Sequence, residues 1–468
     1  MDYRLEKDSL GARQVPAGAY YGVQTVRAME NFQITGIPIS HYNRLIQALA
    51  CIKKAAALSN HELGILEAEK SRAIAEACRE ARQGFLDEHF PVDVIQGGAG
   101  TSVNMNANEV IGNRALEIMG HLKGEYQYLH PNNHVNLSQS TNDVYPTALR
   151  IACIWYAKEF IPELKKLENS FERKGKEFSD IIKMGRTQLQ DAVPMTLGQE
   201  FSAFGVTIGE DVQRLEEAIK LLQEINMGAT AIGTGINTLP GYSELVSSRL
   251  ADITGLRLVR SGNLVEATSD TGVFVQLSGI LKRIGVKLSK ICSDLRLLSS
   301  GPYTGLREIN LPPVQPGSSI MPGKVNPVIP EMVNQVCYQV TGNDLTVTMA
   351  SESGQLQLNV FEPIIAFNLF QSLQVLTNAC SILRRKCIDG ITANRDKCMH
   401  MVRESCGLTT ALVPRIGYEA AADLAREAMQ GEKSIYDLVL EKGLMSEEEL
   451  CECLDPNNMT CPRNFEVK

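Results

Sequence analysis

Four segments of the chain are rich in glycine, serine, threonine and asparagine, whereas most of the remaining sequence is aliphatic. They comprise residues 96–106, 138–143, 185–191 and 317–327. Their hydroxyl and amide groups can form directional hydrogen bonds with carboxylate oxygens, and Lys324 adds a positive charge. Polar segments of this kind are typical of loops that carry function. Together they suit the binding of a small dicarboxylate.

Three of these segments have a simpler interpretation when each is taken alone. The glycines of residues 97–100 resemble a phosphate-binding loop, but no strand pattern precedes them and no Gly-Lys-Ser/Thr follows. The polar run at 140–142 could be a helix cap, and the dipeptide at 187–188 could be a turn. The segment 317–327 differs, because its glycines, serines and prolines predict a mobile backbone that carries a lysine and an asparagine.

Histidine and cysteine spacing gives little support for a metal site. His130 and His134 are four residues apart, but the Pro-Asn-Asn between them favours a loop over a helical pair of ligands, and nothing nearby completes a zinc site. The 12 cysteines contain no Cys-x-x-Cys pair. We therefore expect them to be buried thiols in a reducing compartment.

Composition and charge exclude several classes of protein. A net charge of −8 and a pI of about 5.6 argue against nucleic-acid or anionic-membrane partners, which need a basic surface. The N-terminus lacks the apolar stretch of a signal peptide, and no run approaches the ~18 apolar residues of a membrane span. We expect a cytoplasmic protein with no nucleic-acid and no membrane partner.

Long apolar stripes at helical spacing dominate the middle of the sequence and predict five long helices. A fold built from helices of roughly 40 Å is best explained by a central bundle. The helix that carries the stripe from Ile151 to Phe171 is expected to bend at Pro162. The stripes are Ile151, Trp155, Phe160, Leu164, Leu167, Phe171; Leu197, Phe201, Phe204, Ile208, Val212, Leu215, Ile219, Leu222; Leu277, Leu281, Ile284, Leu288, Ile291, Leu295, Leu298; Ile329, Val333, Val336, Val340; and Ile365, Leu369, Leu373, Leu376, Cys380, Leu383.

The prediction is an all-α protein with three mostly helical domains, since 468 residues exceed the ~250–300 residues of one core. The N-terminal domain covers residues 1–139, the central bundle 140–395 and a small C-terminal domain 396–468. Shorter helices are expected on either side of the bundle. The last of them should begin with a capping box between Ser446 and Glu449.

The four polar segments, in this order and at these separations, resemble the active-site blocks of the fumarase/aspartase superfamily. Gly317-Ser318-Ser319-x-Met321-Pro322-x-Lys324-x-Asn326 resembles its signature, and the resemblance covers essentially the whole chain. It implies a homotetramer in which five helices from each of four subunits form a twenty-helix core. Each active site would then draw residues from three chains.

The resemblance also implies a mechanism. A base removes a proton from the carbon next to one carboxylate, a doubly negative aci-carboxylate forms, and a leaving group departs from the adjacent carbon to give fumarate. Fixed donors must stabilise that dianion. Ser318 would be the base, which requires neighbouring N–H groups or positive charge to favour its alkoxide. The implied substrate-binding residues are Thr101, Ser140, Thr141 and Ser319 for the carboxylate that becomes the dianion, Thr187, Lys324 and Asn326 for the other carboxylate, and Asn142 and Gln188 for the leaving amino group.

The choice of leaving group depends on Gln188. Superfamily members that eliminate water from malate typically carry histidine there, whereas a neutral glutamine suits the orientation of an amino group. Residues 184–197, 330–336 and 355–363 also resemble the ammonia-eliminating members. We therefore expect L-aspartate and fumarate as substrate and product. A class II fumarase and a non-catalytic protein with a lyase fold remain the alternatives.

Two departures from the family pattern leave questions open. Tyr303 occupies a position where relatives usually have arginine, and residues 406–416 differ from the usual Gly-Ile-x-Thr-x-x-Asn-Pro pattern. The chemistry requires no cofactor and no metal ligand set is evident. The sequence leaves open activation by a divalent cation, an effector site for aspartate, the physiological direction and the tolerance for substrate analogues.

Overall fold

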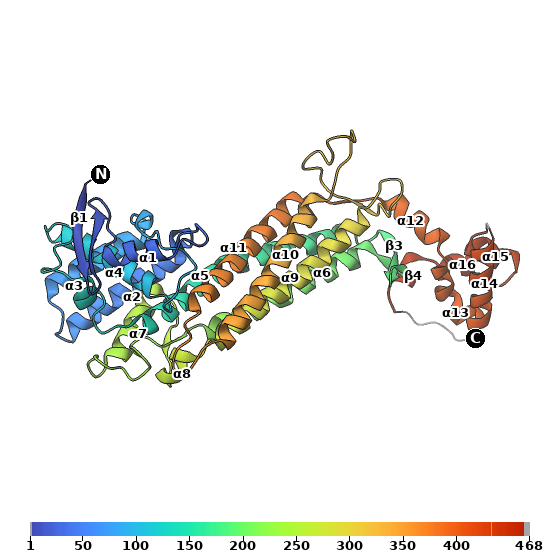
Figure 1. The fold of residues 1–468 in the computed structure, drawn as a ribbon. Coiled ribbons are helices and arrows are strands. Elements are labelled where there is room, and N and C mark those ends of the chain that lie inside the picture. Colours follow the sequence, from blue (N-terminus) through green and yellow to red (C-terminus); the bar gives the residue numbers. More distant parts are fainter. Residues whose placement is uncertain (1, 432, 463–468) are drawn as a thin grey trace. The chain divides into compact units, whose positions relative to one another are not determined.

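The structure is a computed structural model that describes residues 2–431 and 433–462. Figure 1 shows that helices dominate it, and the sheets in the described residues are four two-stranded pairs. The all-α prediction is therefore confirmed. No helix in this part of the chain has the length and hydropathy of a membrane-spanning segment.

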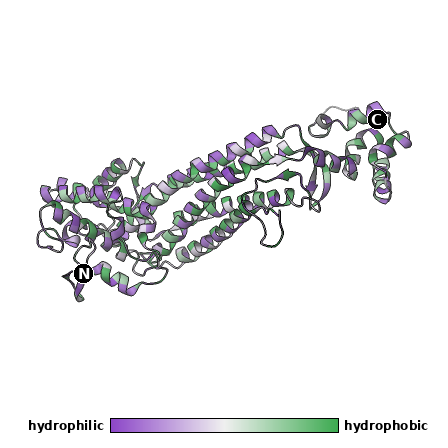
Figure 2. Cartoon of the chain, turned by 90° about the horizontal axis from the view of Figure 1, so that it is seen from above, coloured by the Kyte–Doolittle hydropathy of each residue, from purple (hydrophilic) through white to green (hydrophobic). Residues whose placement is uncertain are grey.

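The five predicted long helices are present (Figure 1). They are α5 (Thr141–Glu177), α6 (Leu197–Leu221), α9 (Gly272–Leu298), α10 (Val328–Glu352) and α11 (Glu362–Lys386). Every stripe residue predicted for α6, α9 and α11 is buried, and in the α5 stripe only Trp155 is half-exposed. Helix α10 continues 12 residues beyond the predicted stripe, which ended at Val340. Figure 2 shows apolar and polar residues side by side along these helices, as one-sided burial requires.

The chain divides into two compact units, and the boundary between them passes through each long helix. The first unit contains residues 1–162, 213–285 and 338–377, and the second contains 163–212, 286–337 and 378–468. Helix α5 begins at Thr141 and α12 at Arg395, next to the boundaries expected from the sequence. The division into three domains itself stays a prediction.

The long helices pack against one another within each unit. In the first unit Asn343 of α10 donates to Ser372 of α11 at 3.0 Å, and the Arg150 guanidinium of α5 lies 5.3 Å from the Phe274 ring centroid of α9. In the second unit Asn334 of α10 donates to the Ser289 carbonyl of α9 at 2.9 Å. These polar contacts supplement the buried stripes and fix which helices are neighbours.

Short elements complete the first unit. Its strands form the hairpin β1–β2 and the parallel pair β5–β6. The elements are β1 (Tyr3–Asp8), β2 (Gly11–Pro16), α1 (Val23–Asn31), η1 (Ile39–His41), α2 (Asn43–Glu62), α3 (Ala68–Arg82), η2 (Asp87–His89), α4 (Thr101–Ile118), η3 (Pro131–Val135), β5 (Glu224–Ile225), α7 (Tyr242–Thr254), β6 (Val259–Arg260) and α8 (Leu264–Ser269).

The second unit contains two antiparallel pairs, β3–β4 and β7–β8, and the helices that follow α11. The capping box predicted at the start of α16 is confirmed: Ser446 Oγ accepts from Glu449 N at 3.1 Å, and Ser446 N donates to Glu449 at 3.0 Å. The elements are β3 (Ile182–Thr187), β4 (Gln190–Thr196), β7 (Ile309–Asn310), η4 (Ile388–Gly390), β8 (Thr392–Ala393), α12 (Arg395–Glu404), η5 (Cys406–Leu408), α13 (Thr409–Ile416), α14 (Tyr418–Gln430), α15 (Ile435–Glu441), α16 (Glu447–Cys453) and α17 (Pro456–Met459).

The segment around His130 and His134 corrects one expectation, because it forms the short π-helix η3 instead of a loop. His130 Nδ1 accepts from the backbone N–H groups of Asn132 and Asn133, and His134 Nδ1 accepts from His130 N at 2.7 Å. Each ring thus accepts from backbone N–H groups at the start of the turn, and Pro131 has no N–H group that needs an acceptor. The burial expected of the cysteines is confirmed for nine of the 12, whereas Cys406, Cys451 and Cys461 are not buried.

Candidate active site

The first polar segment leads into the N-terminus of α4. Gly98 and Gly100 both have positive φ, at 93° and 87°, and Thr101 is the first helical residue. A Cβ on Gly100 would lie 2.3 Å from the Tyr145 ring. These glycines therefore form a tight turn against an aromatic side chain, and Thr101 lies exposed at the free N–H end of a helix, a position that favours anions.

The second polar segment forms the start of α5. Asp143 is fully buried and its two carboxylate oxygens accept from Ser140 N at 2.9 Å and from Gly228 N and Thr230 N at 3.0 Å. Burial raises the pKa of Asp143 to about 6. Asn142 Nδ2 donates to Ala231 O at 2.7 Å. The segment from residue 226 to 231 thus holds the three polar residues at 140–142 in place, a function that the sequence did not reveal.

The buried ammonium group of Lys53 is linked through Asn104 to the hydroxyl group of Thr141. Lys53 Nζ donates to Asn104 Oδ1 at 2.6 Å, Asn136 Oδ1 at 2.9 Å and Gln139 Oε1 at 3.0 Å. Asn104 Nδ2 then donates to Thr141 Oγ1 at 3.1 Å. Because the Thr141 oxygen accepts this bond, its own proton remains available for an anion.

Lys53 was not among the residues expected at the site, although the sequence carries a signal for it. It falls within the largely apolar stretch from Ile46 to Leu58, on the buried face of α2, where a charged residue is out of place. Burial lowers the pKa of Lys53 to about 7, and the nearby carboxylate of Asp143 opposes that shift. The interior behind Thr141 therefore contains one ammonium and one carboxyl group.

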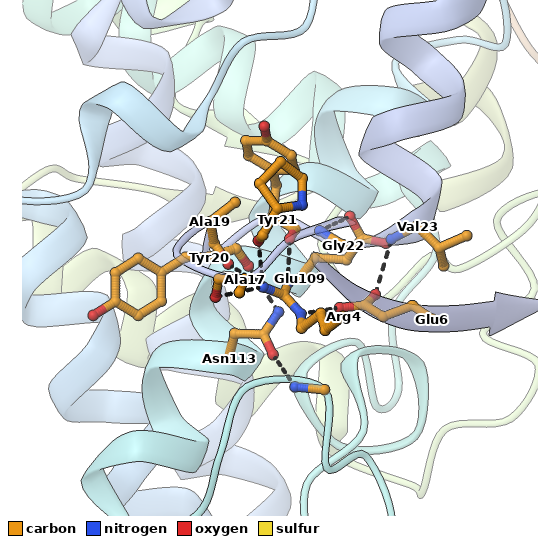
Figure 3. Close-up of polar contacts among 12 residues, drawn as sticks. Arg4, Glu6, Ala17, Ala19, Tyr20, Tyr21, Gly22, Val23, Glu109 and Asn113 are labelled. Carbon is orange, nitrogen blue, oxygen red and sulfur yellow. Dashed lines mark hydrogen bonds and ion pairs between the residues drawn. The ribbon is translucent and has the colours of Figure 1, made fainter. Parts of the chain in front are cut away.

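The start of α1 is anchored to α4, the helix that begins at Thr101 (Figure 3). Glu109 of α4 accepts from Gly22 N at 2.8 Å and from Thr25 Oγ1 at 2.6 Å, and Glu6 accepts from Arg4 Nε at 2.7 Å. A Cβ on Gly22 would lie 2.5 Å from Glu6 Oε2. Burial raises the pKa of Glu109 to about 7. This cluster holds α4 at its middle, about two turns from Thr101.

The third polar segment is the tip of the β3–β4 hairpin in the second unit. Thr187 pairs with Gln190, and the two turn residues Gln188 and Leu189 have φ of 54° and 64°. Positive φ at both positions is typical of a type I′ turn, which usually contains Asn-Gly. Glutamine and leucine there are strained, and such strain is characteristic of functional positions.

A buried ion cluster holds this hairpin. Glu308 is fully buried and its two oxygens lie 2.8 Å from Lys183 Nζ and 2.6 Å from Arg186 Nη1, both on β3. Lys183 also pairs with Glu200 of α6. Glu308 immediately precedes β7, which leads into the fourth segment. One carboxylate therefore connects the stem of the turn at 187–188 with the stem of the loop that carries Ser318.

The fourth segment closes on itself. Gly317 N donates to Lys324 O at 2.7 Å and Asn326 Nδ2 donates to Gly317 O at 2.7 Å. A Cβ on Gly317 would lie 2.7 Å from Lys324 O, so only glycine fits. Asn326 thus has a structural bond in addition to the substrate contact that the resemblance implies.

Within this loop Ser318 Oγ accepts from Ile320 N at 3.2 Å and from Met321 N at 3.0 Å. Two N–H groups directed at one hydroxyl oxygen favour its alkoxide form, which is the requirement stated above for a serine base. Ile320 is 84% exposed, and Ser319 next to the base is exposed as well. The loop therefore presents Ser318 on an accessible, self-supported turn.

The predicted residues fall into three groups. Thr101, Ser140, Thr141 and Asn142 belong to the first unit, where the bond between Asn104 and Thr141 joins the starts of α4 and α5. Thr187 and Gln188, and separately Ser318, Ser319, Lys324 and Asn326, belong to the second unit. Among the described residues, no hydrogen bond links the hairpin turn to the loop.

Comparisons with known proteins identify the family. A family model described as "Lyase" matches residues 11–342, and one described as "Fumarase C C-terminus" matches residues 408–461. The chain belongs to this lyase family, the fumarase/aspartase superfamily. Within it, the chain is 59% identical to the aspartate ammonia-lyase of Pseudomonas fluorescens over 100% of this chain and 98% of that protein. It is 54% identical to the aspartate ammonia-lyase of Escherichia coli strain K12, covering 98% and 96%.

Solved structures agree with the fold. A fumarate lyase:delta crystallin from Brucella melitensis bound to cobalt has a TM-score of 0.96 and 56% identity, covering 98% of this chain and 100% of that one. A class II fumarase from Schistosoma mansoni has a TM-score of 0.94 at 37% identity, covering 99% and 100%. The same fold therefore occurs in a class II fumarase, so the fold alone does not decide the leaving group.

Proposed function

We infer that the chain is an aspartate ammonia-lyase, a carbon–nitrogen lyase that interconverts L-aspartate with fumarate and ammonia. The observation that carries this inference is the full-length identity of 59% to an enzyme of that name. Gln188 at the tip of the β3–β4 hairpin agrees with it.

We propose that Ser318 is the base. As an alkoxide it takes the proton from the carbon next to the side-chain carboxylate of aspartate, and the electron pair moves into that carboxylate to give the dianion. The pair then forms the carbon–carbon double bond as the carbon–nitrogen bond breaks and ammonia leaves. The N–H groups of Ile320 and Met321, which point at Ser318 Oγ, support this role.

The dianion needs donors that are already in position. We propose that Thr101, Ser140, Thr141 and Ser319 hold it. The bond from Asn104 to Thr141 supports this proposal, because it leaves the Thr141 proton for the substrate. Thr187, Lys324 and Asn326 would bind the other carboxylate, and Asn142 and Gln188 would orient the amino group.

The substrate assay separates the candidates. Purified protein with L-aspartate should generate the ultraviolet absorbance of fumarate and release ammonia. If L-malate reacts and L-aspartate does not, the protein is a fumarase; if neither reacts, the fold is kept without catalysis. Replacing Ser318 by Ala should lower turnover by several orders of magnitude, on the scale of ~10⁴ or more for an essential group. Lys324→Ala should chiefly raise KM.

We further propose a homotetramer whose active sites each combine residues from three chains. Large apolar side chains exposed on the long helices support it, including Val286 at 57%, Tyr338 at 63%, Leu345 at 61% and Met349 at 62%. Sedimentation analysis should give a mass four times that of one chain.

Mixing inactive variants tests the sharing of sites between chains. Ser318→Ala and Thr141→Val subunits, each inactive alone, are unfolded and refolded together in equal amounts. Random assembly should restore about a quarter of the sites, because each site then needs one intact copy of each segment. No recovered activity would argue that one chain supplies a whole site.

We also propose a cytoplasmic enzyme whose chemistry needs no cofactor, since the proton acceptor, the cation and the donors are all groups of the chain. Unchanged activity after dialysis against a chelator would support the proposal that the chemistry needs no metal cofactor. Restoration of lost activity by a divalent ion alone would overturn it.

A further inference from the structure

A cavity of about 380 Å³ in the second unit lies between the C-terminal end of α9 and the loop that carries Ser318. Its volume is within the roughly 300–1,000 Å³ typical of small-molecule sites. Both Lys324 and Asn326 line it. The cavity is therefore next to two residues that the proposed function assigns to a carboxylate.

Charged side chains of one sign line this cavity. They are Arg296 at the end of α9, Arg307 in the following turn and Lys324 in the loop, and no aspartate or glutamate is among the lining residues. Cations that share one cavity repel each other, and an anion bound between them removes that repulsion. Other arginines of the same unit have acidic partners, as in the pair of Arg395 with Asp180 at 2.8 Å.

Arg307 is held in position by its backbone while its side chain remains available. Its φ is 48°, its N–H donates to Ser300 O at 3.0 Å, and its carbonyl accepts from Asn394 Nδ2 at 2.9 Å. Among the described residues, no ion pair or hydrogen bond engages its guanidinium. A strained, non-glycine residue with an unused planar cation is well suited to bind a carboxylate through two parallel bonds.

We propose that this cavity binds one carboxylate of the dicarboxylate substrate, with Arg307 as a specificity-determining cation beside Lys324. The inference rests on the proposed function, because it takes the substrate to be a four-carbon dicarboxylate. Arg296 contributes positive charge, although its Nη1 also donates to Asn334 at 3.3 Å. Arg307 thereby supplies a second cation for the substrate, since Arg186 of the third segment is paired with Glu308.

Binding of succinate, which cannot react, tests the proposal by calorimetry. Arg307→Gln should weaken succinate binding by at least about tenfold, as expected for loss of a charge-assisted bond. Succinamate has only one carboxylate, so the preference for succinate over succinamate should also shrink. Arg307→Lys keeps the charge and should retain most of the affinity.

Arg257→Gln is the matched control, since it removes an equally exposed arginine of the first unit and should leave affinity unchanged. Unchanged succinate binding in Arg307→Gln would overturn the proposal. Equal weakening of succinate and succinamate would overturn it too, because a merely structural role affects both ligands alike. If the wild-type protein fails to convert aspartate while the Arg307→Gln loss is observed, only the proposed function fails.

Discussion

The buried carboxylate of Glu308 offers a quantitative test of how the hairpin at 187–188 is held. Glu308 is fully buried, while its partners Lys183 and Arg186 are 2% and 15% exposed. Glu308→Gln keeps the shape of the side chain but removes its charge. Lys183 then keeps its ion pair with Glu200, Arg186 loses its ion pair, and glutamine presents an N–H₂ group toward one of the two cations.

Breaking a buried ion pair on one side costs about 3–5 kcal/mol, because the remaining charge stays desolvated. We expect Glu308→Gln to lower the free energy of unfolding of the second unit by that amount. The exposed pair of Arg395 with Asp180, at 54% and 69% exposure, provides the control. Asp180→Asn should cost less than about 1 kcal/mol.

Urea denaturation measures the free energy of unfolding of both variants. Hydrogen exchange measures how often the β3–β4 hairpin opens in each of them. Because Glu308 connects the stem of the turn that carries Thr187 with the stem of the loop that carries Ser318, kcat for aspartate should fall and succinate should bind more weakly. Equal stability of Glu308→Gln and Asp180→Asn would refute the view that the cluster holds the hairpin. A loss of succinate affinity without a change in kcat would refute its positioning role.

Three other predictions concern single groups. Burial lowers the pKa of Lys53 to about 7, so the unfolded chain binds more protons between pH 7 and about 10, and the wild-type melting temperature minus that of Lys53→Met should increase from pH 7 to 9; a constant difference would contradict the burial of a titrating ammonium. Gly317→Ala forces Cβ against Lys324 O and should lower turnover by about a hundredfold in the steady-state assay, whereas Gly279→Ala, which has open space around it, should not. Gly100→Ala drives Cβ into the Tyr145 ring at positive φ and should destabilise the first unit by about 1–3 kcal/mol in urea; stability equal to that of wild type would show that the ring can move away.

Elements whose signal is local could be predicted from the amino-acid sequence. The 3.6-residue spacing of apolar residues predicts the buried stripes of α6, α9 and α11. Two residues three positions apart, Ser446 and Glu449, predict the capping box. The order of the four polar segments was sufficient for the family, because it needs no knowledge of contacts. The loop expected around His130 was wrong because the acceptor role of two imidazole rings depends on the fold of the turn.

The residues that support the site from far away in the sequence can be identified only in the tertiary structure. Lys53 meets Asn136 and Gln139, and Glu308 meets Arg186, across more than 80 positions of sequence, so neither pairing has a local pattern. A buried ammonium or carboxylate group is stable only when it is paired or hydrogen-bonded, and its partners can come from any part of the chain. The cation at Arg307 is the same case: its sequence neighbours show an ordinary turn, and only the cavity places it beside Lys324.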